Sequence, residues 1–201
     1  MSNLQKYKSI IDAFSNTNIG VIGDIVADIS ISGRPIKLSR EAPVVVVSHE
    51  FETIIPGGAG NTVNNISKLG SKVYPVCLIG EDDIGQKLVD YFSGNENVET
   101  NGLFISKSDY TTTKTRILAG DVNTTKQQVL RIDKEPKYSI QESLETEILN
   151  YIDSVNEKVD AWVVSDYGYN LITPKVLTKI KEFPRNKTVV VDSRNRLREY
   201  T

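Results

Sequence analysis

A glycine-rich segment, Gly57-Gly58-Ala59-Gly60-Asn61, carries the most chemical information in the chain. Several glycines at the start of a helix let the backbone approach a ligand and leave N–H groups free to point at it. Asn61 adds a donor and an acceptor, the combination that recognition of a hydroxyl group requires. For the glycines alone, a plain turn is an equally good interpretation. The segment is therefore a candidate site for binding hydroxyl groups.

Two common nucleotide-binding patterns fit this segment poorly. Gly58-x-Gly60 is followed by Val63 where the dinucleotide fingerprint has its third glycine, and no clean strand is predicted to run directly into it. The P-loop pattern Gly-x-x-x-x-Gly-Lys-[Ser/Thr] occurs nowhere in the chain. The sequence therefore argues against a nicotinamide oxidoreductase and against a P-loop nucleotide hydrolase.

Aspartates follow three of the predicted apolar strands. Asp24 and Asp28 lie at and just beyond the end of one strand, and Asp166 and Asp192 each follow another. Ligands of open α/β sheets bind beyond the carboxyl ends of the strands, where an aspartate can accept hydrogen bonds from hydroxyl groups. A helix cap or turn would explain any one of these residues equally well. Their occurrence at three strand ends favours a shared polar site.

A cluster of cations is predicted on two neighbouring strands. Lys114 and Arg116 are two residues apart, so their side chains share one face of a strand. Arg131, on the next predicted strand, could join them. Three cations on one small surface suit a phosphate group, whereas a solvated strand face is the commoner reason for such charges. The pattern leaves both interpretations open.

Short apolar strands and helices alternate along the chain, which predicts an α/β fold with a mostly parallel, doubly wound sheet. Helices are expected at about 4–15, 57–69, 84–92, 140–154 and 173–182, and core strands at about 18–25, 73–79, 102–106, 160–165 and 188–191. Strands with a polar alternation within 29–51 and 111–132 interrupt this order. They are expected to form an antiparallel appendage beside the main sheet.

Composition limits the class of protein. The 201 residues are 39% hydrophobic and 25% charged with a net charge of -2, which is ordinary for one soluble domain and gives no basic excess for nucleic acid. No apolar run approaches the ~18 residues that span a bilayer, and the first residues lack the apolar core of a secretion signal. We therefore expect a cytoplasmic protein with neither nucleic-acid nor membrane partners.

The chain has a single cysteine, Cys77, and a single histidine, His49. Cys77 lies in an apolar run, which predicts a reduced core residue rather than a nucleophile. One cysteine and one histidine cannot build a zinc site or a catalytic Cys–His pair within the chain. Any chemistry must rest on carboxylates, lysine, arginine, backbone amides or a bound metal.

In combination, these motifs resemble the ribokinase-like (PfkB) carbohydrate kinases. Within that family they are most similar to the heptose-7-phosphate kinase domain of bifunctional ADP-heptose synthases. The resemblance extends over about 18–200 and rests on the order and spacing of its parts. These parts are Gly23-Asp24…Asp28, Ser39-Arg40-Glu41-Ala42-Pro43-Val44, Pro56-Gly57-Gly58-Ala59-Gly60-Asn61, Thr113-Lys114-Thr115-Arg116, Gln128-Val129-Leu130-Arg131-Ile132-Asp133, Ser165-Asp166-Tyr167 and Val190-Val191-Asp192-Ser193-Arg194.

The resemblance implies a ribokinase-like fold, in which a small β lid, here from about 29–51 and 111–132, covers the sugar. It implies transfer of the γ-phosphoryl group of ATP, with Mg2+, to a sugar or sugar phosphate, and a homodimer through the lid. The residues that it places on the substrate side are Asp28, Gly57, Gly58, Asn61, Lys114, Arg116, Arg131 and Asp166. Asp192 is placed on the cofactor side.

The sequence departs from the family in two respects. The Gly-Ala-Gly-Asp motif with the catalytic base, and an Asn-x-x-Glu motif that organises Mg2+, are absent. We expect the base beyond Thr201, so that 1–201 form the N-terminal part of one kinase domain without the C-terminal part of its core. Gly168-Tyr169 also replaces the small residue and lysine that often follow Ser-Asp-Tyr in heptose kinases. The alternative is a non-catalytic sugar-binding or regulatory module that has lost the base.

Overall fold

A parallel sheet forms the centre of the computed structural model, which describes residues 2–121, 124–137 and 139–200. Its strand order is β5-β4-β1-β8-β9, and every neighbouring pair is parallel. The strands are β1 (Asn18–Gly23), β4 (Lys72–Gly80), β5 (Leu103–Ser106), β8 (Ala161–Asp166) and β9 (Thr188–Ser193). This sheet confirms the predicted α/β fold.

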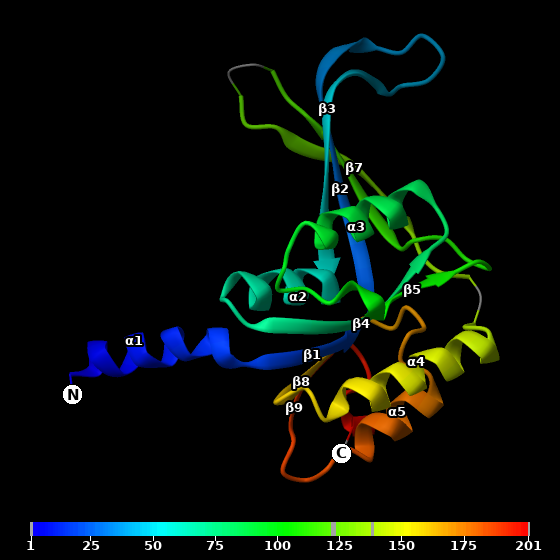
Figure 1. Cartoon of the computed structure of the whole chain (residues 1–201). Helices are drawn as coiled ribbons and strands as arrows, with labels where there is room; N and C mark the ends of the chain where they lie inside the picture. The colour runs from blue at the N-terminus through cyan, green and yellow to red at the C-terminus, as the bar shows by residue number, and fades with distance from the viewer. Residues whose placement is uncertain (1, 122–123, 138, 201) are drawn as a thin grey trace.

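Helices cover both faces of the sheet, as a doubly wound fold requires (Figure 1). They are α2 (Ala59–Lys68), α3 (Asp83–Ser93), α4 (Glu142–Asn156) and α5 (Pro174–Lys181). Val21 of β1 packs in one core cluster with residues of α2 and α3, whereas Ile22 packs in another with residues of α4 and α5. Successive strand residues point to opposite faces, so the continuous apolar run of β1 serves both cores.

The first helix lies outside this arrangement. α1 (Asn3–Ala13) begins at a capping box made by Ser2 and Gln5, and it has no buried residue. It extends away from the sheet, as Figure 1 shows, and a 3-10 turn, η1 (Phe14–Asn16), joins it to β1. Its apolar residues at helical spacing, Leu4, Tyr7, Ile10 and Ile11, are therefore exposed. Further 3-10 turns are η2 (Thr100–Gly102) and η3 (Leu197–Tyr200).

A second sheet, called the lid sheet below, has the strand order β3-β2-β6-β7. It consists of β2 (Ile25–Leu38), β3 (Val45–Gly58), β6 (Thr113–Ala119) and β7 (Gln127–Lys134). Figure 1 shows the long β2–β3 hairpin projecting from the main sheet, with β6 and β7 beside it. The expected antiparallel pairing holds for β2–β3 and β6–β7 but is wrong for β2–β6, which run parallel.

The junctions of the lid sheet with the core place polar residues close together. Only Asp24 separates β1 from β2, so the chain passes directly from the core into the lid. β3 runs directly into α2, which contradicts the expectation that no strand precedes the glycine-rich segment. This strand belongs to the lid sheet and pairs antiparallel with β2, unlike the parallel core strand of a dinucleotide-binding unit.

Among the described residues, no helix is long and apolar enough to span a membrane.

Candidate functional site

Asp24 joins the end of β1 to the loop after β8. Its carboxylate is buried and accepts hydrogen bonds from the backbone N–H groups of Tyr167 at 2.9 Å, Tyr169 at 3.0 Å and Leu171 at 3.2 Å. Burial raises the pKa of Asp24, and the three backbone hydrogen bonds oppose that rise without cancelling it. Asp24 therefore fixes the position of this loop and has its oxygens occupied by the protein.

The glycines of the predicted hydroxyl-binding segment lie against two aspartates. A Cβ atom on Gly57 would come within 2.3 Å of Oδ2 of Asp28, and one on Gly58 within 2.4 Å of the carbonyl oxygen of Asp24. Gly58 also has φ +58°, a conformation that favours glycine. Glycine is thus required here because β3 and α2 pass so close to Asp24 and Asp28. Asn61 lies exposed in the first turn of α2.

One face of the lid sheet is polar. In the strand register, Asp28 lies next to Lys114 and Lys114 opposite Asp133, while Ser30 lies next to Arg116 and Arg116 opposite Arg131. Residues side by side in a sheet project from the same face. We call these six residues, Asp28, Ser30, Lys114, Arg116, Arg131 and Asp133, the polar lid face. The intervening positions, such as Ile29, Ile31 and Ile117, form the opposite face.

The charges of the polar lid face are mostly paired with one another. Nη1 of Arg116 donates to Oδ1 of Asp28 at 2.5 Å, and Nε of Arg131 donates to Oδ1 of Asp133 at 2.9 Å. Lys114 forms no ion pair within the described ranges. The three predicted cations therefore do share a surface, but two of them neutralise carboxylates.

The polar lid face meets the core at the loop after β8. Nζ of Lys114 lies 5.8 Å from the ring centroid of Tyr167 and 5.7 Å from that of Tyr169. Both distances are in the range of cation–π attraction. Because these tyrosines lie in the loop after β8, the ammonium group of Lys114 lies over the carboxyl end of the parallel sheet, where open α/β folds bind ligands. The sequence motifs include Tyr167 and Tyr169 but assign no role to either ring.

Asp166 and Asp192 lie at neighbouring strand ends on the other side of this loop. Asp166 is buried and accepts hydrogen bonds from Arg196 at 2.9 Å, Ser193 at 3.0 Å and Tyr200 at 2.8 Å. Burial alone would raise the pKa of Asp166, but the hydrogen bonds of Arg196, Tyr200 and Ser193 and the charge of Arg196 together lower it. Asp192 is exposed near the end of β9.

The structure therefore divides the predicted site residues into two groups. Asp28, Gly57, Lys114, Arg116 and Arg131 are connected through the lid, whereas the carboxylate of Asp166 accepts hydrogen bonds from β9, from the segment that follows it and from Gly168 in the loop after β8. A substrate role for Asp166 remains a prediction, and it would require part of this network to open. The network contains Arg196 and Tyr200, which the sequence patterns did not identify.

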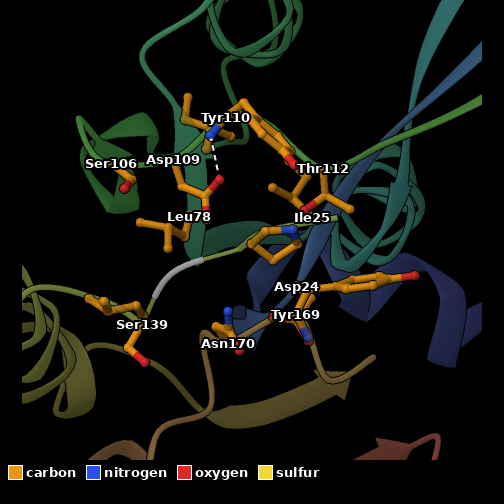
Figure 2. Close-up of a pocket in the computed structure, with 13 residues that line it drawn as sticks. Asp24, Ile25, Leu78, Ser106, Asp109, Tyr110, Thr112, Ser139, Tyr169 and Asn170 are labelled. Atoms are coloured by element: carbon orange, nitrogen blue, oxygen red, sulfur yellow. Dashed lines mark hydrogen bonds between the residues drawn. The ribbon is translucent and has the colours of Figure 1, made fainter. Parts of the chain in front are cut away.

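Two hollows adjoin the loop after β8. The smaller, about 20 Å³, lies between the ends of β1, β4 and β5 and is shown in Figure 2, with Asp24, Tyr169 and Asn170 along one side and Asp109 and Tyr110 along the other. This volume corresponds to about one water molecule. The larger, about 470 Å³, lies beside α4 and α5 and includes Glu145 and Arg196. Asn170, at φ 78°, borders both hollows.

The remaining candidates for chemistry are unreactive or isolated. Cys77 is a buried free thiol, and burial raises its pKa, which keeps it protonated and supports the core role predicted for it. His49 is exposed on the lid sheet. In the part of the chain that the structure describes, no group of three or more His, Cys, Asp or Glu residues could hold a metal ion. The described residues therefore do not by themselves provide a site for Mg2+.

A doubly wound core with a β lid that faces the carboxyl ends of its strands defines a class of protein, and comparison with known sequences identifies it. The family model described as "pfkB family carbohydrate kinase" matches residues 16–191. The chain therefore belongs to the pfkB family of carbohydrate kinases, and the resemblance seen in the sequence motifs is confirmed.

Its curated relatives include bifunctional HldE proteins. The chain is 37% identical over 183 residues to "Bifunctional protein HldE" of Gluconobacter oxydans, covering 90% of this chain and 37% of the relative. It is 36% identical over 174 residues to the protein of the same name from Geobacter sulfurreducens, covering 87% of this chain and 34% of the relative. The chain thus spans little more than a third of the length of these relatives.

Solved structures show the same fold at low sequence identity. A possible 1-phosphofructokinase from Thermotoga maritima matches with a TM-score of 0.61 at 18% identity, over 91% of this chain and 56% of that structure. Arabidopsis thaliana ribokinase, solved with ribose and ATP, matches with a TM-score of 0.58 at 15% identity, over 88% of this chain and 53% of that structure. The ribokinase-like fold expected from the sequence is confirmed.

Proposed function

We propose that the protein to which this chain belongs transfers the γ-phosphoryl group of ATP to a hydroxyl of a sugar or sugar phosphate, with a heptose 7-phosphate as the first candidate substrate. The chain contributes the sugar-binding side of that reaction. Membership of the pfkB family supports the kinase class, and the bifunctional HldE relatives direct the choice of sugar.

The observation that carries this proposal is the position of Asp28. Its carboxylate lies on the polar lid face, beside the backbone of Gly57, and its side chain is 27% exposed. A carboxylate that is partly exposed between a lid and the ends of parallel strands can accept hydrogen bonds from two sugar hydroxyls. Gly57 leaves the space for it, and Asn61, exposed in the first turn of α2, is the proposed second hydroxyl-binding residue.

The cations of the polar lid face favour a phosphorylated sugar. Lys114 and Arg116 belong to the same strand as neighbours on one face, and Arg131 lies opposite Arg116. A phosphate group binds such cations through charge-assisted hydrogen bonds, which are roughly twice as strong as neutral ones. A neutral sugar would cover the ammonium group of Lys114 without pairing its charge, which costs free energy.

The proposed reaction also uses ATP and Mg2+, and we assign their binding to residues other than those that bind the sugar. When bound, ATP supplies the phosphoryl group and Mg2+ neutralises its developing charge. Asp192, near the carboxyl end of β9, is the proposed cofactor-side residue, and Asp166, at the end of the neighbouring strand β8, stays a proposed substrate-side residue. The hydrogen bond that Asp166 accepts from Ser193 joins the ends of β8 and β9.

The lid sheet also offers a surface for a second copy of the chain. A groove of about 530 Å³ is lined mainly by apolar residues of all four lid strands, Ile31, Val44, Val45, Val47, His49, Ile117, Val129 and Leu130. Val45 and Leu130 are each about half exposed, at 51% and 52%. Exposed apolar surface of this extent is typical of an interaction site, and we propose a homodimer through it.

A non-catalytic sugar-binding or regulatory module is the second candidate. A kinase and a sugar-binding module would use the same lid and the same polar lid face, so the residues described here are compatible with both. Sequencing the gene beyond Thr201 separates the two candidates, since the kinase requires a carboxylate base and a module does not.

The proposal is tested by ligand binding to the chain itself. Thermal unfolding is measured with a heptose 7-phosphate, fructose phosphates, ribose and nucleosides, and compared between wild type and Asp28→Asn. A ligand that binds the folded state raises the melting temperature by mass action. We expect the largest rise with a sugar phosphate and its loss in Asp28→Asn. Equal responses to every ligand, or a response that Asp28→Asn leaves unchanged, would contradict a lid site for sugars.

A further inference from the structure

Lys114 is held differently from every other cation of the polar lid face. Arg116 and Arg131 pair with carboxylates, whereas the ammonium group of Lys114 contacts the rings of Tyr167 and Tyr169, at 5.8 and 5.7 Å from the ring centroids. These rings belong to the core loop after β8, and Lys114 belongs to the lid strand β6. The contact therefore joins two parts of the fold that are distant in the sequence.

The two carboxylates nearest to Lys114 in the sheet are already occupied. Asp28 is its neighbour on β2 and Asp133 is its partner on β7, yet Asp28 is bound by Arg116 and Asp133 by Arg131. An aromatic ring attracts a cation without carrying a formal charge of its own. The ammonium group is thus held in place while its positive charge is not neutralised.

The rings themselves are fixed by the core. The backbone N–H groups of Tyr167 and Tyr169 both donate to Oδ2 of the buried Asp24. Tyr169 is 8% exposed, so its ring cannot turn away from the loop without unpacking. Asp24, at the end of β1, therefore fixes the conformation of the loop, and the loop fixes the positions of the two rings. The rings in turn hold the ammonium group of Lys114 in place.

We propose that Tyr167 and Tyr169 are positioning residues that hold the un-neutralised ammonium group of Lys114 over the carboxyl end of β8 as the anion-binding group of the lid site. This inference rests on the proposed function for its ligand, the phosphate of a sugar phosphate. A lysine is more often held by an acidic side chain, which would cancel its charge. The two rings hold Lys114 without cancelling that charge, so the ammonium group remains able to bind the phosphate of the ligand.

The holding contact is tested first, without any ligand. The chain is treated with limiting acetic anhydride, and the acetylation rate of each lysine is followed by peptide mass spectrometry. The rate at Lys114 is divided by the rate at the exposed Lys158, which serves as an internal reference. We expect Tyr167→Leu to raise this ratio about threefold or more and Tyr167→Phe to leave it unchanged, since phenylalanine keeps the ring.

Tyr167 is the position of choice because it is only half-buried, so its replacement leaves the packed core intact. Tyr169→Phe and Tyr169→Leu form the second pair, with circular dichroism and urea unfolding to show that each variant is folded. If Lys114 reacts at the same relative rate in wild type, Tyr167→Leu and folded Tyr169→Leu, the rings do not hold it and the proposal fails.

The role in anion binding is tested next by calorimetry with a heptose 7-phosphate and the same heptose without phosphate. We expect Tyr167→Leu to weaken binding of the phosphorylated sugar about threefold or more, Tyr167→Phe to restore it, and neither to change binding of the neutral sugar. Ring-dependent reactivity at Lys114 with unchanged sugar-phosphate affinity would overturn the positioning role. If wild type binds no sugar at all, the proposed function fails, while the lysine reactivity still decides whether the rings hold Lys114.

Discussion

Arg116 on β6 donates a hydrogen bond to Asp28 on β2, and the two residues are 88 positions apart in the sequence. The residue expected to bind phosphate thereby orients the residue expected to bind sugar hydroxyls. The second oxygen of Asp28 lies against the backbone of Gly57, where no side chain would fit. The pair is about one third exposed, at 34% and 27%, so a ligand can reach both groups from the same side.

This pairing changes what replacement of Arg116 should do. We expect Arg116→Gln to weaken binding of both a sugar phosphate and the matching neutral sugar, because Asp28 loses the group that holds its rotamer. Each loss should be about 1–3 kcal/mol, as for a hydrogen bond to a charged group. Isothermal calorimetry with the two ligands measures both affinities.

Arg131→Gln is the matched control, since Arg131 lies opposite Arg116 but pairs with Asp133. It should leave the neutral sugar unaffected. A result in which Arg116→Gln weakens only the phosphorylated ligand would show that Arg116 acts on the phosphate alone and that Asp28 needs no partner.

Gly58 is predicted to be intolerant of any side chain. Gly58→Ala would place a methyl group 2.4 Å from the carbonyl oxygen of Asp24, at a residue with φ +58°. Backbone strain and overpacking each cost about 1–3 kcal/mol, so we expect a loss in the free energy of unfolding of about 3 kcal/mol or more. Urea unfolding followed by circular dichroism measures it.

Gly168 provides a control that separates these two costs. Its φ is +80°, but a Cβ atom there would meet nothing within 4 Å. Gly168→Ala should therefore cost only the conformational strain, about 1–2 kcal/mol. Equal losses for Gly58→Ala and Gly168→Ala would mean that contact with Asp24 contributes nothing.

The main sheet could be predicted because its signal is local. The apolar runs of β1, β8 and β9 and the helical spacing of α4 and α5 each lie within one short window, so their type and order follow from periodicity. The lid was harder to delimit. β2 and β3 together extend from Ile25 to Gly58, beyond the expected limits of 29 and 51, and β2 continues through Gly33 and Pro35 with register shifts at both places. Glycine and proline within a strand indicate an end or a bulge equally well.

For the site, the sequence predicted only relationships between residues of the same strand. A spacing of two places Lys114 and Arg116 on one face, and that prediction is consistent with the register of β6 with its neighbours. The partners of these residues depend on which strands pair and on the register of that pairing. The sequence pattern indicates neither the pairing nor the register. Only the three-dimensional structure therefore shows that Arg116 pairs with Asp28 and that Lys114 lies against the two tyrosines.

The apolar groove of the lid sheet should govern the oligomeric state. We expect the chain to be a dimer at micromolar concentration and both Val45→Lys and Leu130→Lys to be monomers, because a buried lysine without a partner is costly. Ile36→Lys is the control, since Ile36 is 62% exposed on β2 but does not line the groove. Sedimentation velocity distinguishes the species. A wild-type monomer, or a monomer produced equally by Ile36→Lys, would place the interface elsewhere.

Asp166 should make the stability of the fold depend on pH in the acidic range. Its folded-state pKa is lowered below the ordinary value near 3.8, so the folded state binds its proton less readily than the unfolded state does. The stabilisation is therefore complete above the ordinary value and is lost as the pH falls through the lower, folded-state value. Urea unfolding of wild type and Asp166→Asn between about pH 3 and 7 measures this effect.

Asp166→Asn removes the charge that Arg196 and Tyr200 bind, with little change in size. At pH 7 we expect the variant to be less stable by about 2–4 kcal/mol, the cost of breaking hydrogen bonds to a buried charge. The difference from wild type should shrink as the pH falls below about 4, since wild type then loses the same charge. Asp192→Asn, at an exposed position near the end of β9, should follow the wild-type curve throughout. A difference between wild type and Asp166→Asn that stays constant from pH 7 to pH 3 would show that the network depends on the shape of the side chain and not on its charge.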